Sequence, residues 1–249
     1  MPSSGKTDRD PTAPLPLSEQ AYRNLRREIV NGTLPAGGPL RFEQLRERYG
    51  FSFSPLREAL ARLQAEHLVV ATALRGFRVA DTSIEEMWDT IETRVLIETA
   101  ALRDAIGHAT DDWEVAIISA FHSLSQYAGR LARAAAPADE AAIEEVERRH
   151  QAFHASLVAT ASSKWLRELS ALLYVQTERY RRPLLAQRLS PDEQRRNIEQ
   201  EHRDLLDACL QRDADTACAL LAAHLRSTGR IIEQTGLPPA GAGCDIQRR

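Results

Sequence analysis

The sequence predicts a mainly α-helical protein, with a small N-terminal unit of helices and two strands followed by a larger antiparallel bundle of six or seven helices. Glycine and proline are sparse, at 12 each in 249 residues, and long stretches such as 139–161 contain no helix breaker. The patterns typical of strands lie before residue 81. A chain of this length is long enough for two domains, each with its own core.

Composition and charge divide the chain into four segments. Residues 1–17 are polar and proline-rich and are expected to form a disordered arm. A head at 18–81 and a body at 82–235 follow, with a flexible tail at 236–249. Residues 20–80 hold ten Lys and Arg against five Asp and Glu, whereas residues 81–235 hold 18 against 26. A basic head on an acidic body indicates that only the head meets a polyanion.

The sequence also predicts where the protein resides. No apolar run approaches the roughly 20 residues of a membrane span, and the N-terminus lacks the apolar region of a signal peptide. The three cysteines have no CxxC spacing, which is typical of a reduced protein without a disulfide framework. We expect a cytoplasmic protein with no membrane partner.

The head is predicted to contain three helices and a β-hairpin. Tyr22, Leu25, Ile29 and Val30 form the apolar stripe of a first helix at 21–31. The remaining elements are a turn-rich loop at 34–39, a short helix at 42–49 that Gly50 ends, a helix capped by Ser54 with Pro55 at its first position, and strands at 68–71 and 76–80.

This order of elements is that of a winged helix-turn-helix, in which the second helix of the pair enters the major groove of DNA. Arg57 lies near the start of that helix and is placed to contact a base edge, most often guanine. Ser52 and Ser54 are placed for phosphates, and Arg75 and Gly76 at the wing tip for the minor groove or backbone. The pattern leaves open that Arg57 is simply a solvated arginine.

The body is predicted to be an antiparallel bundle of six long helices. A capping box at Ser83 and Glu86 opens it, and Ser190-Pro191 is a second strong start signal. The predicted helices are about 84–107, 111–136, 139–161, 163–188, 191–211 and 214–235.

Four histidines in three of these helices predict a metal site. His150 and His154 are four apart and share a helix face, and His202 and His224 lie in the fifth and sixth helices. Neutral imidazole suits a transition metal such as zinc or nickel. The alternative is that these histidines are merely packed, as we expect for the remaining ones: His67, His108 and His122.

The head resembles that of GntR-family transcriptional regulators. The resemblance covers about 18–80, and its residues are Tyr22, Leu25, Ile29, Gly32, Leu34 and Gly37, the run Pro-Leu-Arg-Glu-Ala-Leu at 55–60, Leu63, Gly76, Phe77 and Val79. It implies binding to a double-stranded DNA operator, by a homodimer. One departure stands before the recognition helix, where Phe53 replaces an arginine that often contacts DNA in this family.

The body resembles the all-helical ligand-sensing domain of the FadR-type branch of that family, over about 84–234. The matching residues are Arg94, Glu98 and Ala101, Phe153-His154, Glu201-His202, and Ala217 to Leu225. The resemblance implies a site of one Asp and three His, but His150 stands in place of the Asp. The sequence around His154 is similar to that of the carbon-starvation-induced repressor branch, which implies a short dicarboxylate effector.

These resemblances imply a repressor that a small carboxylate releases from its operator. Four imidazoles would leave a bound ion about one charge more positive than the family's site, which favours an anionic effector. Arg94 matches a family position that faces the pocket and is the predicted effector contact. The alternative is that Glu98 pairs with it as structural support. Arg179 and Arg182 are further candidates, interpreted here as a solvated basic face.

Two other functions remain as alternatives at this stage. One is a helical metallohydrolase with a water-activating metal, although Glu201, the nearest acidic neighbour of His202, points about 100 degrees away from it on a helix. The other is a DNA-binding dimer whose body holds no metal. A DNA-binding head would be idle in an enzyme, and we therefore expect no catalytic residues.

Overall fold

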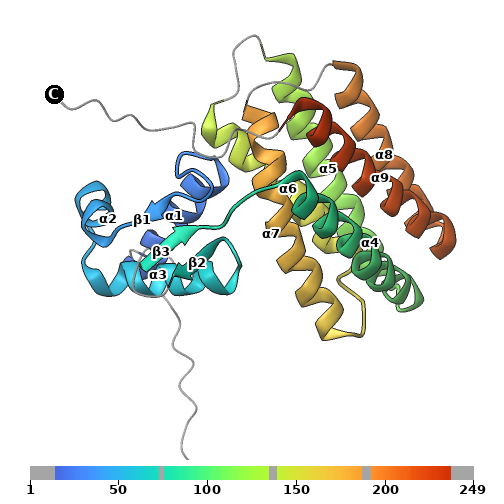
Figure 1. Cartoon of the computed structure of the whole chain (residues 1–249). Coiled ribbons are helices and arrows are strands. Elements are labelled where there is room, and N and C mark those ends of the chain that lie inside the picture. The colour runs from blue at the N-terminus through green and yellow to red at the C-terminus, as the bar shows by residue number, and fades with distance from the viewer. Residues whose placement is uncertain (1–14, 73–75, 135–138, 187–191, 237–249) are drawn as a thin grey trace, which may run out of the picture.

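A computed structural model of the chain describes residues 15–72, 76–134, 139–186 and 192–236. It contains a small head and a helical bundle beside it (Figure 1). The mainly α-helical class is confirmed, with a winged helix-turn-helix followed by a helical domain. No helix in these described ranges is long and apolar enough to cross a membrane. The arm at 1–14, the wing residue Arg75 and the tail from 237 onwards lie outside the described residues.

The head contains three helices and a small sheet around one apolar core. The helices are α1 (Leu17–Val30), α2 (Phe42–Tyr49) and α3 (Phe53–Ala65), and the strands are β1 (Pro39–Leu40), β2 (Val69–Thr72) and β3 (Gly76–Val79). The antiparallel sheet has the order β1-β3-β2. Gly50 ends α2 at a φ of 71°, a left-handed conformation that glycine adopts without steric cost.

Three details of the head differ from the prediction. Helix α1 begins at Leu17, one turn before its apolar stripe, with Glu19 in its first turn, where a carboxylate interacts favourably with the helix dipole. Helix α3 begins at Phe53 with Ser52 at the cap, so Pro55 lies in the third position. Proline is tolerated there because first-turn N–H groups have no acceptor within the helix. Strand β1 was predicted as part of a loop, since two residues are too few to show the alternation of apolar and polar side chains that is typical of a strand.

The body contains six helices within the described residues, close to the predicted ranges. They are α4 (Ile84–Gly107), α5 (Asp111–Arg133), α6 (Glu140–Leu157), α7 (Lys164–Ala186), α8 (Asp192–Leu210) and α9 (Ala214–Thr235). Ser83, Thr110, Asp139 and Asp213 each accept a hydrogen bond from the backbone N–H three residues later. The predicted start at Ser190-Pro191 lies outside the described residues, although the helix itself is present from Asp192.

The bundle core brings helices distant in sequence together. Helix α4 packs against α7 and α9, and α5 packs against α6 and α8. A Cβ atom at Gly229 of α9 would lie 2.7 Å from Ile91 Cδ1 and 2.8 Å from the Trp88 ring on α4. Glycine at this position therefore permits the close approach of α4 and α9. This packing surrounds the inward face of α6, where two of the four histidines lie.

Helices α6 and α7 both contact the head. Glu140 of α6 lies 3.7 Å from Arg27, and Figure 1 shows α7 on the side facing the blue N-terminal helices. Val175 packs against the head core. The Gln176 side-chain amide donates to the Glu66 carbonyl, and the Arg179 guanidinium donates to the Asp81 carbonyl. Glu178 accepts from Arg26 of α1 at 2.5 Å. A structural change along α7 would therefore reach the head directly.

Candidate functional site

The predicted DNA-contacting residues lie together at the start of α3. Ser52, Ser54 and Arg57 are all exposed there, and Gly76 is exposed at the start of β3. Phe53 is 50% exposed, and its ring centroid lies 4.4 Å from that of Phe42. The aromatic residue that replaces the family's arginine therefore extends the edge of the head core. The sequence does not indicate this contact, because Phe42 and Phe53 lie on separate helices and periodicity reports only on residues of one helix.

The four predicted histidines come together inside the bundle. One ligand atom from each of His150, His154, His202 and His224 can be chosen so that all lie within 4.8 Å of one another. His154, His202 and His224 are 4–6% exposed. His67, His108 and His122 are exposed and lie apart from this cluster. Helices α6, α8 and α9 supply the four rings, so residues far apart in the sequence form one cluster.

The spacing of two of these nitrogens matches a tetrahedral metal site. His202 Nε2 and His224 Nε2 are 3.2 Å apart. Two nitrogens that each lie about 2.0–2.1 Å from one tetrahedral zinc ion are separated by roughly 3.3 Å. The pair can also share a single hydrogen bond, since only one of two facing neutral nitrogens needs a proton. In both arrangements His202 Nε2 faces His224 Nε2.

His154 distinguishes between these arrangements. Neither of its ring nitrogens has a hydrogen-bond partner among the described residues, and both are buried. Leaving such a group unpaired costs about 1–3 kcal/mol. Burial is the largest cause that holds the pKa of His150, His154 and His202 well below the usual value, and neighbouring histidines and arginines add to it. The imidazoles of these three histidines are therefore neutral, and neutral imidazole is a good ligand for a transition metal.

Two of the histidines are oriented by residues that the sequence did not single out. His150 Nδ1 lies 2.7 Å from the Tyr174 hydroxyl, which also accepts from Arg181 at 2.9 Å. Arg181 pairs with the buried Glu147 at 2.6 Å. Carboxylate partners of ligating histidines commonly fix the ring orientation and tautomer, and the hydroxyl and ion pair have the equivalent role here. The His150–Tyr174 and Arg181–Glu147 contacts cross between α6 and α7, and no local pattern reveals them.

Glu201 orients His224 in the same way. Its carboxylate oxygen Oε2 lies 2.8 Å from His224 Nδ1, so the opposite nitrogen, Nε2, faces the cluster. The prediction that Glu201 points away from His202 agrees with this contact, because Glu201 is engaged with the next helix instead.

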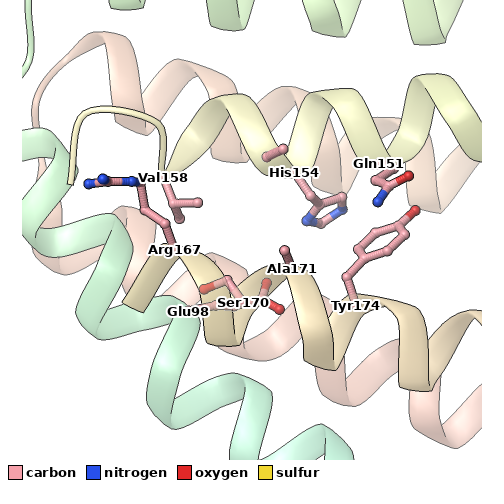
Figure 2. A pocket seen from close by; sticks show the side chains of 9 residues that line it. Glu98, Gln151, His154, Val158, Arg167, Ser170, Ala171 and Tyr174 are labelled. Atoms are coloured by element: carbon pink, nitrogen blue, oxygen red, sulfur yellow. The ribbon is translucent and has the colours of Figure 1, made fainter. Parts of the chain in front are cut away.

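A cavity of about 140 Å³ adjoins His154. Figure 2 shows His154 over its middle, with Tyr174 and Gln151 at one end and Arg167 at the other. Arg167 makes one hydrogen bond, to the Ala161 carbonyl, and has no carboxylate partner among the described residues. The seven-residue step from Arg167 to Tyr174 spans roughly 10 Å along α7. The cavity therefore has the dimensions of a small metabolite. A buried imidazole lines it, while the Arg167 guanidinium at its far end points away from His154 (Figure 2).

Arg94 lies beside this cavity and not among the residues that line it. It is 2% exposed. Its guanidinium binds both carboxylate oxygens of Glu98, at 2.6 and 3.3 Å, and the Thr177 hydroxyl at 2.7 Å. Glu98 itself lines the cavity with its charge neutralised by this pair. The alternative role of Glu98 as the structural partner of Arg94 is thus present in the structure.

Arg179 and Arg182 are buried, at 6% and 3% exposure, so their interpretation as a solvated face was wrong. Arginine is usually a surface residue, and the sequence did not reveal that the head covers this part of α7. Both side chains lie on the face of α7 that is turned toward the head, and neither lines the cavity beside His154.

Comparisons with known proteins agree with this architecture. Residues 17–79 match the family described as bacterial regulatory proteins, gntR family, and residues 89–227 match the FCD domain. BphR, an uncharacterized HTH-type transcriptional regulator of Paraburkholderia xenovorans, is 37% identical over 222 residues, which are 89% of this chain and 87% of BphR. GlaR, an HTH-type transcriptional repressor of Escherichia coli, is 33% identical over 217 residues, covering 87% of this chain and 96% of GlaR.

The solved structure of E. coli McbR/YncC has the same fold. It superposes with a TM-score of 0.70 at 20% identity and covers 89% of this chain and 99% of that one. The two matched segments correspond to the winged helix-turn-helix and to the bundle that holds the histidines. The head and the bundle therefore each account for one of the two family matches in this chain. The chain belongs to the GntR family of bacterial regulatory proteins, in the FadR-type branch with a C-terminal FCD domain, and is a DNA-binding transcriptional regulator.

Proposed function

We propose that this protein is a homodimeric repressor whose bundle holds a divalent transition metal, zinc or nickel, together with a small carboxylate that lowers affinity for the operator. The observation that carries the proposal is the convergence of four imidazoles, three of them buried, one of which, His154, lines a small cavity. A two-fold dimer would place two α3 helices on the half-sites of a palindromic operator. The repressor direction is supported by the likeness to GlaR.

His150, His154, His202 and His224 would hold the metal, which supplies a positive centre that a carboxylate can ligate. Imidazole ligands would leave the charge of the ion uncompensated, and Arg167 lies at the other end of the cavity. A carboxylate that faces His154 and Arg167 would meet positive charge at both ends. For Arg94 to contact the ligand as predicted from its family position, it would have to exchange Thr177 for the ligand.

A metallohydrolase is less well supported by the same geometry. Catalytic zinc sites need a general base beside an open metal position. Glu201, the acidic residue nearest to His202 in sequence, is held by His224, and Glu98 is held by Arg94. The matches to regulator families favour a sensor as well. A metal-free dimer differs from the sensor in a single measurable property, the metal content of the purified protein.

The proposed response is tested with metal-replete protein and a DNA fragment selected from a random pool. We expect one of the linear mono- and dicarboxylates of two to six carbons to stabilise the protein, by about 2.7 kcal/mol at 100 times its Kd. The same compound should weaken DNA binding by roughly 5- to 150-fold, the usual range of coupling between sites. Thermal unfolding and fluorescence anisotropy measure the two effects.

Arg167→Gln should weaken binding of that carboxylate about tenfold or more, because a hydrogen bond to a charged group contributes about 1.5–3 kcal/mol. Lys164→Gln is the matched control, since Lys164 is exposed and its substitution removes the same charge from the same helix. If no carboxylate binds, the effector proposal is wrong. Tighter DNA binding in its presence would instead make the protein an activated regulator.

Helix α7 provides the proposed route from the ligand to the head. Tyr174 and Thr177 face the histidine cluster and Arg94, whereas Val175, Gln176 and Glu178 contact the head. Positions three or four apart share a face of a helix, so one and a half turns carry both sets of contacts. Coupling requires that the ligand favour one arrangement of the heads over another, and a rigid helix between them supplies the connection.

Val175→Ala/Gln176→Ala should therefore keep metal and carboxylate affinity within about twofold while reducing the effect of carboxylate on DNA binding at least severalfold. The substitutions remove head contacts of α7 and leave its ligand face intact. Glu168→Gln, at an exposed α7 position, is the control. Calorimetry with the carboxylate and anisotropy with DNA separate binding from coupling. Undiminished coupling in the double variant would exclude this route.

A further inference from the structure

A second cavity lies between the head and the bundle, where α1 faces α6 and α7. Its volume is about 300 Å³, and its described lining includes none of the four histidines. Four of the lining side chains are arginines and one is a carboxylate: Arg23, Arg26, Arg27, Arg182 and Glu144. A cavity of this size is at the lower end of the range for small-molecule sites. Arg23 is paired with Glu19 and Arg27 lies 3.7 Å from Glu140, so the charge available to an anion depends on the other lining arginines.

Arg182 is the most unusual of these residues because its buried guanidinium is mostly unpaired. The side chain is 4% exposed. Its Nε and Nη2 atoms are buried and have no hydrogen-bond partner within the described part of the chain. The remaining nitrogen, Nη1, lies 3.4 Å from Glu178, which is a weak contact. A buried charge is strongly unfavourable unless it is paired and hydrogen-bonded.

The one carboxylate that Arg182 meets is shared. Glu178 accepts a 2.5 Å hydrogen bond from Arg26 through its other oxygen, so two guanidinium groups compete for one negative charge and this trio keeps a net charge of +1. Arg26 also lies 3.8 Å from Glu66, but that carboxylate is already bound by the Tyr22 hydroxyl at 2.6 Å. The protein therefore leaves positive charge uncompensated at a buried position that lines a cavity.

We propose that this cavity is an anion site, separate from the histidine cluster, for a compact polyvalent oxyanion such as a phosphate group or a short polycarboxylate. Arg182 is its principal ligand, because its two free nitrogens present the planar fork that binds two oxygens at once. Arg26 and Arg27 of α1 complete the site from the head. The anion supplies the missing negative charge and satisfies the orphaned N–H groups.

The location gives such an anion a regulatory effect. Arg26 and Arg27 belong to the DNA-binding head, whereas Arg182 belongs to α7 of the bundle. An anion that contacts both stabilises the arrangement in which head and bundle are close together. By linkage, its binding changes operator affinity whenever DNA prefers a different arrangement of the heads.

The test is a titration of the full-length, metal-replete protein with inorganic phosphate, sulfate or citrate, in chloride buffers of matched ionic strength. We expect saturable stabilisation of the wild type, and binding about tenfold weaker or more in Arg182→Gln. Without anion, Arg182→Gln should unfold at the same temperature as the wild type or higher, since an uncompensated buried charge is removed. A purely structural arginine would give the opposite change in unfolding temperature.

Two control variants locate the effect. Arg103→Gln removes an exposed arginine of α4 and should leave anion affinity unchanged, as should Lys164→Gln, which removes an exposed charge from α7. Stronger binding of phosphate than of citrate assigns the site to phosphate compounds, and the reverse order assigns it to polycarboxylates. The proposal is overturned if anions stabilise the wild type no more than chloride, or if Arg182→Gln binds them equally well. Should that variant not fold, unchanged affinity in Arg27→Gln, whose side chain is 42% exposed, overturns it.

Discussion

His154→Ala/His202→Ala is expected to reduce the metal content of the purified protein from about one ion per chain to near zero. The two residues come from different helices, α6 and α8. Each is buried and lies beside the other three imidazole rings of the cluster. Removing both leaves two imidazoles, which cannot enclose a tetrahedral ion. Elemental analysis after dialysis against metal-free buffer measures the change.

The same variant should lose the stabilisation that metal gives to the wild type. An ion at 1,000 times its Kd contributes about 4.1 kcal/mol, which corresponds to roughly 8–16 °C in Tm for a domain of this size. His108→Ala/His122→Ala is the matched control, because both residues are exposed and lie outside the cluster. Circular dichroism checks folding, and His154→Gln/His202→Gln repeats the test with less loss of volume. An undiminished metal content would exclude these ligands.

The second large effect is expected at the DNA-binding surface. Arg57→Ala should weaken binding to the selected operator by about 1–3 kcal/mol if Arg57 contacts a base edge. The side chain is exposed in the first turns of α3, so the substitution should leave the unfolding temperature unchanged. Anisotropy with operator and with scrambled DNA measures specific and non-specific affinity.

The salt dependence separates base contact from phosphate contact. A lost phosphate contact lowers the slope of log K against log salt by about 0.9 and weakens all sequences alike, whereas a lost base contact leaves the slope unchanged and reduces specificity. Arg23→Ala controls for net charge, because this exposed arginine lies on α1 and pairs with Glu19. Equal affinities of Arg57→Ala and wild type for the operator would assign Arg57 no role in recognition.

The sequence predicted the bundle helices well because their ends carry local signals. Ser83 caps α4 and Asp213 caps α9, each through a bond to the third following N–H. The start of α3 was less well predicted, since Ser52 and Ser54 are both suitable caps and proline is acceptable anywhere in the first turn. Strand β1 exists only because β3 pairs with it, a long-range interaction that two residues cannot signal.

For the candidate metal site, the sequence predicted which histidines would be involved but not the residues around them. The spacing of His150 and His154 places two imidazoles on one face, but their approach to His202 and His224 depends on bundle packing. Tyr174 could not be identified from sequence because a lone tyrosine carries no pattern, and its partner His150 is on another helix. The two cavities and the burial of Arg182 arise from contacts between distant elements for the same reason.

The most direct test of the proposed sensor is X-ray absorption spectroscopy at the metal edge of the purified, ligand-free protein. The account predicts three or four nitrogen scatterers at about 2.0–2.1 Å from zinc, with the outer-shell signature of imidazole rings and with no sulfur. The same spectrum should disappear in His154→Ala/His202→Ala. A shell of oxygen scatterers without imidazole, or a sulfur shell near 2.3 Å, would contradict a four-histidine site.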